Sequence, residues 1–200
     1  SAERRAASRS MSAAGSVTKT ISITTDPINI RSLYVAVSGR AEATNDGGEI
    51  WQTWTPGAGT VISTAPIAAG TYGLFGLSNG KLMYTADFLL TAPTEAHDFG
   101  SQIDCIWVNE VNPDRVTVGL ANGQVHITNN MTAIASSTWT QLADFASAVL
   151  WIEESFSTQG QYRIAMGNQV LLTHDSFATT GELVNFGADI AQAHALTEHR

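Results

Sequence analysis

The sequence has little cysteine and no long apolar runs. Cys105 is the only cysteine, so no disulfide can form within the chain. Its apolar neighbours Ile103, Ile106 and Trp107 indicate a buried thiol that packs as a small hydrophobe. No stretch reaches the roughly 18 to 20 apolar residues that a membrane-spanning helix needs. We therefore expect no membrane insertion.

Basic residues are also scarce, with 10 Lys and Arg against 18 Asp and Glu and a formal net charge of -8. A nucleic-acid groove needs a basic stripe that neutralises phosphates, so we expect no nucleic-acid partner. The exception is residues 1–16, mostly Ala, Ser and Arg, which have too little large apolar surface to fold by themselves. This composition predicts a flexible or partner-docked basic arm over 1–16, followed by an acidic repeat domain over 17–200.

A four-fold repeat is present in the rest of the chain. Each unit has two alternating apolar strands around a short Gly or Asn turn, followed by threonine, any residue, and Asp or Asn. The threonines are 41, 43 and 45 residues apart. The four motifs are Thr44-Asn45-Asp46, Thr85-Ala86-Asp87, Thr128-Asn129-Asn130 and Thr173-His174-Asp175.

This period predicts an all-β fold. Asn-Gly and similar pairs between alternating runs are typical of β-hairpins, because both residues accept positive φ. A period of about 40 to 45 residues matches one blade of a β-propeller. We therefore predict a propeller of about four blades, each a four-stranded antiparallel sheet. The units fall near 21–60, 61–100, 101–143 and 144–190.

Four blades either close into a ring or form an open segment or part of a larger propeller. Four is the low end of the blade numbers found in rings. In an open array the terminal blades have faces that only other chains can cover. We slightly favour the open segment, and we expect oligomeric contacts with other protein chains.

The segment from Thr44 to Trp51 resembles the Asp-box, or BNR repeat. Its pattern is Ser or Thr, any, Asp, any, Gly, any, any, aromatic, and Thr44, Asp46, Gly48 and Trp51 meet all four positions. The resemblance implies a folding device at the blade periphery rather than a catalytic site. Without the glycine, the remaining repeats keep the Asx position at Asp87, Asn130 and Asp175.

The known enzymes with Asp-boxes include sialidases, so the resemblance raises the question whether this chain carries the residues of a sialidase site. Such a site needs three convergent arginines, a tyrosine nucleophile with a glutamate partner, and an acid/base aspartate. The nearest echo, Tyr162-Arg163-Ile164-Ala165, lies in the last repeat and lacks the family's proline, so we interpret it as an ordinary strand. Glu153 and Glu154 are neighbours that point to opposite faces of a strand, and we expect a solvated loop edge there.

Other constellations are equally incomplete. The histidines have no metal-ligand spacing, and His194 and His199 near the carboxyl end come closest to one. We predict no catalytic, cofactor-binding or metal-binding residues. The tryptophans are interpreted as core, with a sugar-stacking platform as the alternative. They are Trp51, Trp54, Trp107, Trp139 and Trp151.

The sequence favours a non-enzymatic structural or interaction module of a large assembly. A Lys-poor chain, degenerate repeats and a separate basic arm suit a virion component such as a phage tail or baseplate protein. One alternative is a carbohydrate-binding or sialidase-like propeller with a glycan partner. Another is an assembly factor that resembles BNR-type photosystem stability proteins, for which a basic patch on one face is expected.

Overall fold

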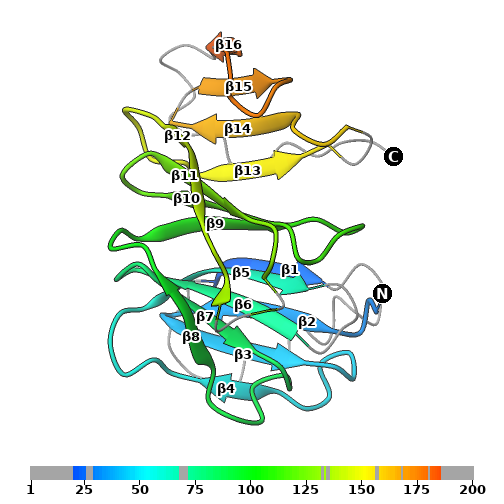
Figure 1. Ribbon diagram of the computed structural model, residues 1–200. Helices are drawn as coiled ribbons and strands as arrows, with labels where there is room; N and C mark the ends of the chain where they lie inside the picture. Colours follow the sequence, from blue (N-terminus) through cyan, green and yellow to red (C-terminus); the bar gives the residue numbers. More distant parts are fainter. Residues whose placement is uncertain are drawn as a thin grey trace. The chain divides into compact units, whose positions relative to one another are not determined.

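The computed structural model describes residues 20–25, 29–67, 72–131, 133, 136–155, 158–167, 169–179 and 181–185 (Figure 1). The predicted arm at 1–16, and also His194 and His199, lie outside these residues. The chain divides into two compact units, Ser1–Gly100 and Ser101–Arg200.

Unit 1 contains two four-stranded antiparallel sheets. In each sheet the spatial order of the strands equals their order in the chain. The first sheet comprises β1 (Thr20–Thr25), β2 (Leu33–Val37), β3 (Arg40–Thr44) and β4 (Gln52–Trp54). The second comprises β5 (Val61–Ile67), β6 (Tyr72–Leu77), β7 (Lys81–Thr85) and β8 (Thr94–Asp98).

Unit 2 repeats this design. Its two sheets are again antiparallel meanders in chain order, and Figure 1 shows β13 to β16 stacked as successive neighbours. The third sheet comprises β9 (Ile103–Val108), β10 (Val116–Leu120), β11 (Gln124–Thr128) and β12 (Thr140–Asp144). The fourth comprises β13 (Trp151–Glu154), β14 (Tyr162–Met166), β15 (Gln169–Thr173) and β16 (Glu182–Asn185).

The predicted fold class, an all-β fold with four four-stranded antiparallel blades of the β-propeller type, is confirmed. A four-stranded meander is the form of such a blade. Within the described ranges, no helix is long and apolar enough to cross a membrane.

The tight turns between the central strands have the backbone conformation that their sequences favour. Ser38 and Gly39 have φ of 47° and 83°, which suits the right-handed twist of the flanking strands. Gly123 has φ of 93°, and a Cβ atom there would lie 1.9 Å from the carbonyl oxygen of Phe145. Both positive φ and close approach of the backbone therefore require glycine at position 123.

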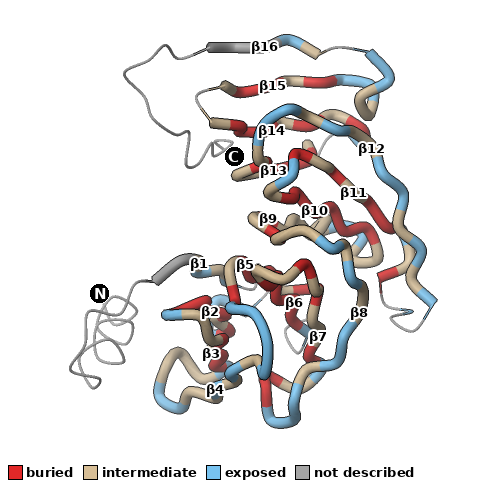
Figure 2. The backbone as a smooth tube through the Cα atoms, turned by 90° about the vertical axis from the view of Figure 1, so that its left-hand side faces the viewer, coloured by how far each residue is buried: buried red, intermediate tan, exposed pale blue. Residues whose placement is uncertain are grey.

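The core of unit 1 is built around Tyr34, a fully buried residue of β2. Its ring stacks on Phe88 at a centroid distance of 5.5 Å and meets the edge of Phe75 at 5.9 Å. Gly73 at the start of β6 packs against the same ring, since an added Cβ would lie 2.4 Å from it. Most buried residues lie on β2, β3, β5 and β6, whereas β8 is largely exposed (Figure 2).

The core of unit 2 joins its two blades. Cys105 of β9 is buried beside Val149 and donates a hydrogen bond from Sγ to its carbonyl oxygen at 3.4 Å. Tyr162 of β14 stacks on Phe177 at 5.1 Å, and Phe177 meets Phe145 at 6.0 Å. Burial raises the pKa of the Cys105 thiol, so the group stays protonated and packs as an apolar side chain.

The first strands of the two blades of unit 1, β1 and β5, both start at the same end of the unit. Thr20 at the start of β1 pairs with Val37, near the β2–β3 turn. Val61 at the start of β5 donates its amide to Gly39 in that same turn at 3.0 Å. The ends of β1 and β5, the starts of β2 and β6 and the connections β3–β4 and β7–β8 therefore lie at one end of unit 1, which we call the Asx end. The turns β2–β3 and β6–β7 lie at the opposite end.

Candidate functional site

The repeated threonine and Asx residues form the same local contact in all four blades. Each threonine is buried, with at most 3% of its surface exposed. Each donates its hydroxyl to the Asx side-chain oxygen two residues later. The distances are 2.6 Å for Thr44 and Asp46, 3.1 Å for Thr85 and Asp87, 2.7 Å for Thr128 and Asn130, and 3.0 Å for Thr173 and Asp175.

The Asp46 carboxylate is used by its own loop. Its oxygens accept the backbone amides of Gly48 at 3.2 Å, Glu49 at 2.9 Å and Ile50 at 3.0 Å. The hydroxyl of Thr44 and the amide of Ile50 lower the pKa of Asp46, because both donate to the charged form. The carboxylate is therefore held ionised by bonds that shape the turn.

Two further turns reach the same backbone shape without glycine. Gly47 and Gly48 have φ of 83° and 92°, whereas Phe88 and Leu89 follow Asp87 with φ of 56° and 65°. The fourth blade does the same at Ser176 and Phe177. A left-handed conformation costs an L-residue about 1 to 2 kcal/mol, so burial of Phe88 and Leu89 has to offset it. The sequence carries no glycine signal at these positions.

Trp51 and Trp54 are both half-buried. The indole nitrogen of Trp51 donates to the carbonyl oxygen of Gly48 at 3.2 Å, inside the turn. Trp54 packs against the core, with its ring 6.2 Å from Phe75. Both indoles therefore support their blade. The remaining tryptophans, all in unit 2 and all half-buried, are Trp107, Trp139 and Trp151.

A buried polar cluster in unit 2 brings together charged and polar side chains from both of its blades. Arg115, just before β10, donates from Nε and Nη2 to the two carboxylate oxygens of Glu154, both at 2.7 Å. Its Nη2 also donates to the Tyr162 hydroxyl at 2.8 Å, and its Nη1 to Asn129 Oδ1 at 2.7 Å. The amide of Gly160 donates to Glu154 at 2.7 Å. No residue pattern in the sequence signals this grouping.

The electrostatics of this cluster stabilise the ion pair. Burial alone raises the pKa of Glu154, but hydrogen bonds from Arg115 and Gly160 outweigh it, and the net pKa lies below the usual value. Burial, followed by the nearby Glu154 charge, raises the pKa of Tyr162 to about 12. The expected solvated edge at Glu153 and Glu154 is wrong: the two are 9% and 0% exposed, because the strand end is covered on both faces.

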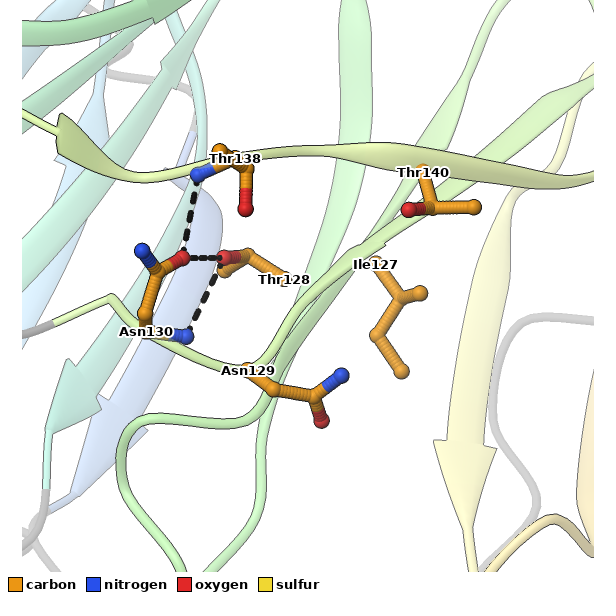
Figure 3. A pocket seen from close by; sticks show the side chains of 6 residues that line it. All are labelled: Ile127, Thr128, Asn129, Asn130, Thr138 and Thr140. Atoms are coloured by element: carbon orange, nitrogen blue, oxygen red, sulfur yellow. Dashed lines mark hydrogen bonds between the residues drawn. The ribbon is translucent and has the colours of Figure 1, made fainter.

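A shallow recess of about 280 Å³ lies beside this cluster (Figure 3). Asn129 belongs both to its lining and to the partners of Arg115. The Asn130 oxygen accepts the amide of Thr138 at 3.0 Å, so that part of the lining is fixed. The lining carries hydroxyl and amide groups and no charge. Its residues are Ile127, Thr128, Asn129, Asn130, Thr138 and Thr140.

Within the part of the chain that the structure describes, no three His, Cys, Asp or Glu side chains gather as a metal site would require. Tyr162 and Arg163 of the sialidase-like echo lie on β14, where Tyr162 is buried at 1% exposure and joins Arg115. No protein-family model matches the chain, and no curated protein matches it.

Proposed function

We propose that this chain is a non-enzymatic structural and interaction module of a large assembly. The proposal rests on one observation, which is that the polar and charged side chains of the turns and of the Arg115 cluster bind groups of the protein itself. The Asx carboxylates bind their own loops, and Arg115, Glu154 and Tyr162 bind one another in the core. The Asx groups fix their own turns, and the buried Arg115 cluster holds the two blades of unit 2 together, because leaving one of its members unpaired in the interior is costly.

The turns are best understood as Asp-box repeats. The supporting features are the buried threonine, the Asx oxygen that accepts its hydroxyl, and the loop amides that Asp46 accepts. In the Asp-box family this turn is a folding device at the blade periphery. The turn therefore supports a scaffold role, and the specific function depends on residues at the surface.

Within this class we favour a virion component, such as a tail or baseplate protein of a phage. The basis is analogy with similar propeller modules in phage tails, together with the Lys-poor composition and the basic arm. The test is quantitative peptide mass spectrometry of particles purified from the source of the gene by density gradient. We expect this chain to follow the particle peak at a fixed ratio to a major capsid protein. Its absence from the peak would overturn the virion assignment.

The recess favours a second candidate, a carbohydrate-binding propeller. The hydroxyl groups of Thr138 and Thr140 and the side-chain amides of Asn129 and Asn130 are uncharged and can hydrogen-bond the hydroxyls of a sugar. A glycan array probed with the full chain tests this. We expect binding that disappears in the Thr138→Val/Thr140→Val variant and persists in Thr94→Val, a matched change on the exposed edge of β8. An array without signal removes the candidate.

A further inference from the structure

Large exposed apolar side chains in unit 1 gather at its Asx end. Ile30 lies in the β1–β2 connection and is 65% exposed, Ile50 in the β3–β4 connection is 65% exposed, and Leu90 in the β7–β8 connection is 70% exposed. Tyr72, at 37%, begins β6 at the same end, but its ring stacks on Tyr84 at 5.7 Å, on the face of the sheet opposite to Gly73. Isolated exposed apolar residues are ordinary, but a concentration of them at one end is typical of an interaction site.

These connections are neighbours in space. Arg31 donates from Nη2 to the carbonyl oxygen of Asp46 at 2.7 Å, and Gly47 donates its amide to the carbonyl oxygen of Arg31 at 3.0 Å. The loop of Ile30 is therefore bonded to the loop of Ile50.

The loop of Leu90 and the start of β6 meet at one aromatic ring. Phe88 stacks on Tyr34 near the start of β2, and Gly73 touches the same ring. Tyr34 thus joins the connections that carry Ile30 and Leu90. We call Ile30, Ile50 and Leu90 the Ile50 surface.

The charge around this surface is negative. Asp46, Glu49 and Asp87 lie in the same loops, and the pKa values of Asp46 and Asp87 are lowered by hydrogen bonds from Thr44 and Thr91. The only arginine in these loops is Arg31, whose guanidinium is bonded to the backbone. Apolar groups in loops that also carry carboxylates suit a partner with cationic and apolar residues together, and the negative charge repels nucleic acid and anionic lipid.

We propose that the Ile50 surface docks a cationic, apolar segment of another polypeptide. The proposal rests on the proposed interaction role and names its surface and the chemistry of its partner. Ile50 and Leu90 would supply the buried contact, and Glu49, which is exposed, would pair with a partner Lys or Arg at the rim.

The test starts with selection of a random 12-residue peptide library, displayed on phage, on the purified full-length chain. We expect enriched peptides to combine Lys or Arg with large apolar residues. One enriched peptide is then synthesised, and its affinity is measured by fluorescence anisotropy. Ile50→Thr is expected to weaken it about tenfold, and Glu49→Lys about threefold with loss of its salt dependence.

The chain offers matched controls. Ile23→Thr makes the same substitution at a site on β1 that is 55% exposed, and Asp144→Lys makes the same charge change at the exposed end of β12 in unit 2. Both are expected to leave affinity within about twofold of the unsubstituted chain. The proposal is overturned if no peptide is enriched, if the enriched peptides are acidic, or if Ile50→Thr and Ile23→Thr weaken binding equally. None of these outcomes depends on whether the chain is found in particles, so the two proposals fail separately.

Discussion

The guanidinium of Arg115 and the carboxylate of Glu154 form a bidentate pair, with Nε and Nη2 each 2.7 Å from one oxygen. The two residues come from the third and fourth blades and are 7% and 0% exposed. The pair therefore links the two blades of unit 2 through a contact that water does not screen. The stability of unit 2 is expected to depend on both partners at once.

Removing both partners of this pair is expected to cost less than the sum of the two single removals. Arg115→Met or Glu154→Met alone should lower the free energy of unfolding by about 3 to 5 kcal/mol, because each leaves an uncompensated buried charge. The double variant should recover at least about 2 kcal/mol relative to the sum of the single effects. Urea unfolding of the four proteins closes the cycle. Additive losses would show that the pair is not coupled.

Alkaline pH is expected to destabilise unit 2 through Tyr162. Its folded pKa of about 12 lies above the unfolded value of about 10, so the folded state holds the phenol proton more tightly. The resulting stability is complete below pH about 10 and is lost as the pH rises through about 12. Tyr162→Phe should lose less stability over this interval in urea titrations. Equal losses in both proteins would place the effect at another group, such as Tyr84, whose pKa is also raised to about 12.

The Asx turns are expected to contribute to stability through their threonines. Thr85 donates to Asp87 and accepts the amide of Leu89 at 3.1 Å in the interior. Thr85→Val keeps the shape but removes both bonds, so we expect a loss of about 1 to 3 kcal/mol. The matched Thr94→Val, at an exposed strand position, should change stability by less than about 0.5 kcal/mol. The two variants are compared by thermal unfolding. Equal losses of stability in both would contradict a structural role for the turn.

The β2–β3 turn leaves room for a stabilising substitution. Ser38 is exposed and has φ of 47°, a conformation that asparagine accepts more readily than serine. Ser38→Asn should raise the free energy of unfolding by about 0.5 kcal/mol. Ser147→Asn makes the same change at an exposed residue without positive φ and should give no gain. A gain in the control alone would show that backbone conformation is not the cause.

The fold was predictable because its signals are local. Strands alternate at period two, glycine turns separate them, and a short polar motif recurs at nearly constant spacing. Each signal depends on residues close together in the chain, and the observed strand order follows the chain order. The left-handed Phe88 and Leu89 were not predictable, because bulky residues ordinarily avoid that conformation and only their burial supports it here.

The sequence by itself determined the all-β class, the blade-sized period and the positions of the hairpin turns, because these follow from contacts between residues near one another in the chain. Only the tertiary structure decided that Glu154 is buried against Arg115 rather than solvated, since that pairing joins residues 39 apart in different blades. It also decided which end of unit 1 exposes Ile50 and Leu90, because adjacent loops there come from different blades. Pairings of this kind depend on how blades pack, and a repeat motif does not encode them.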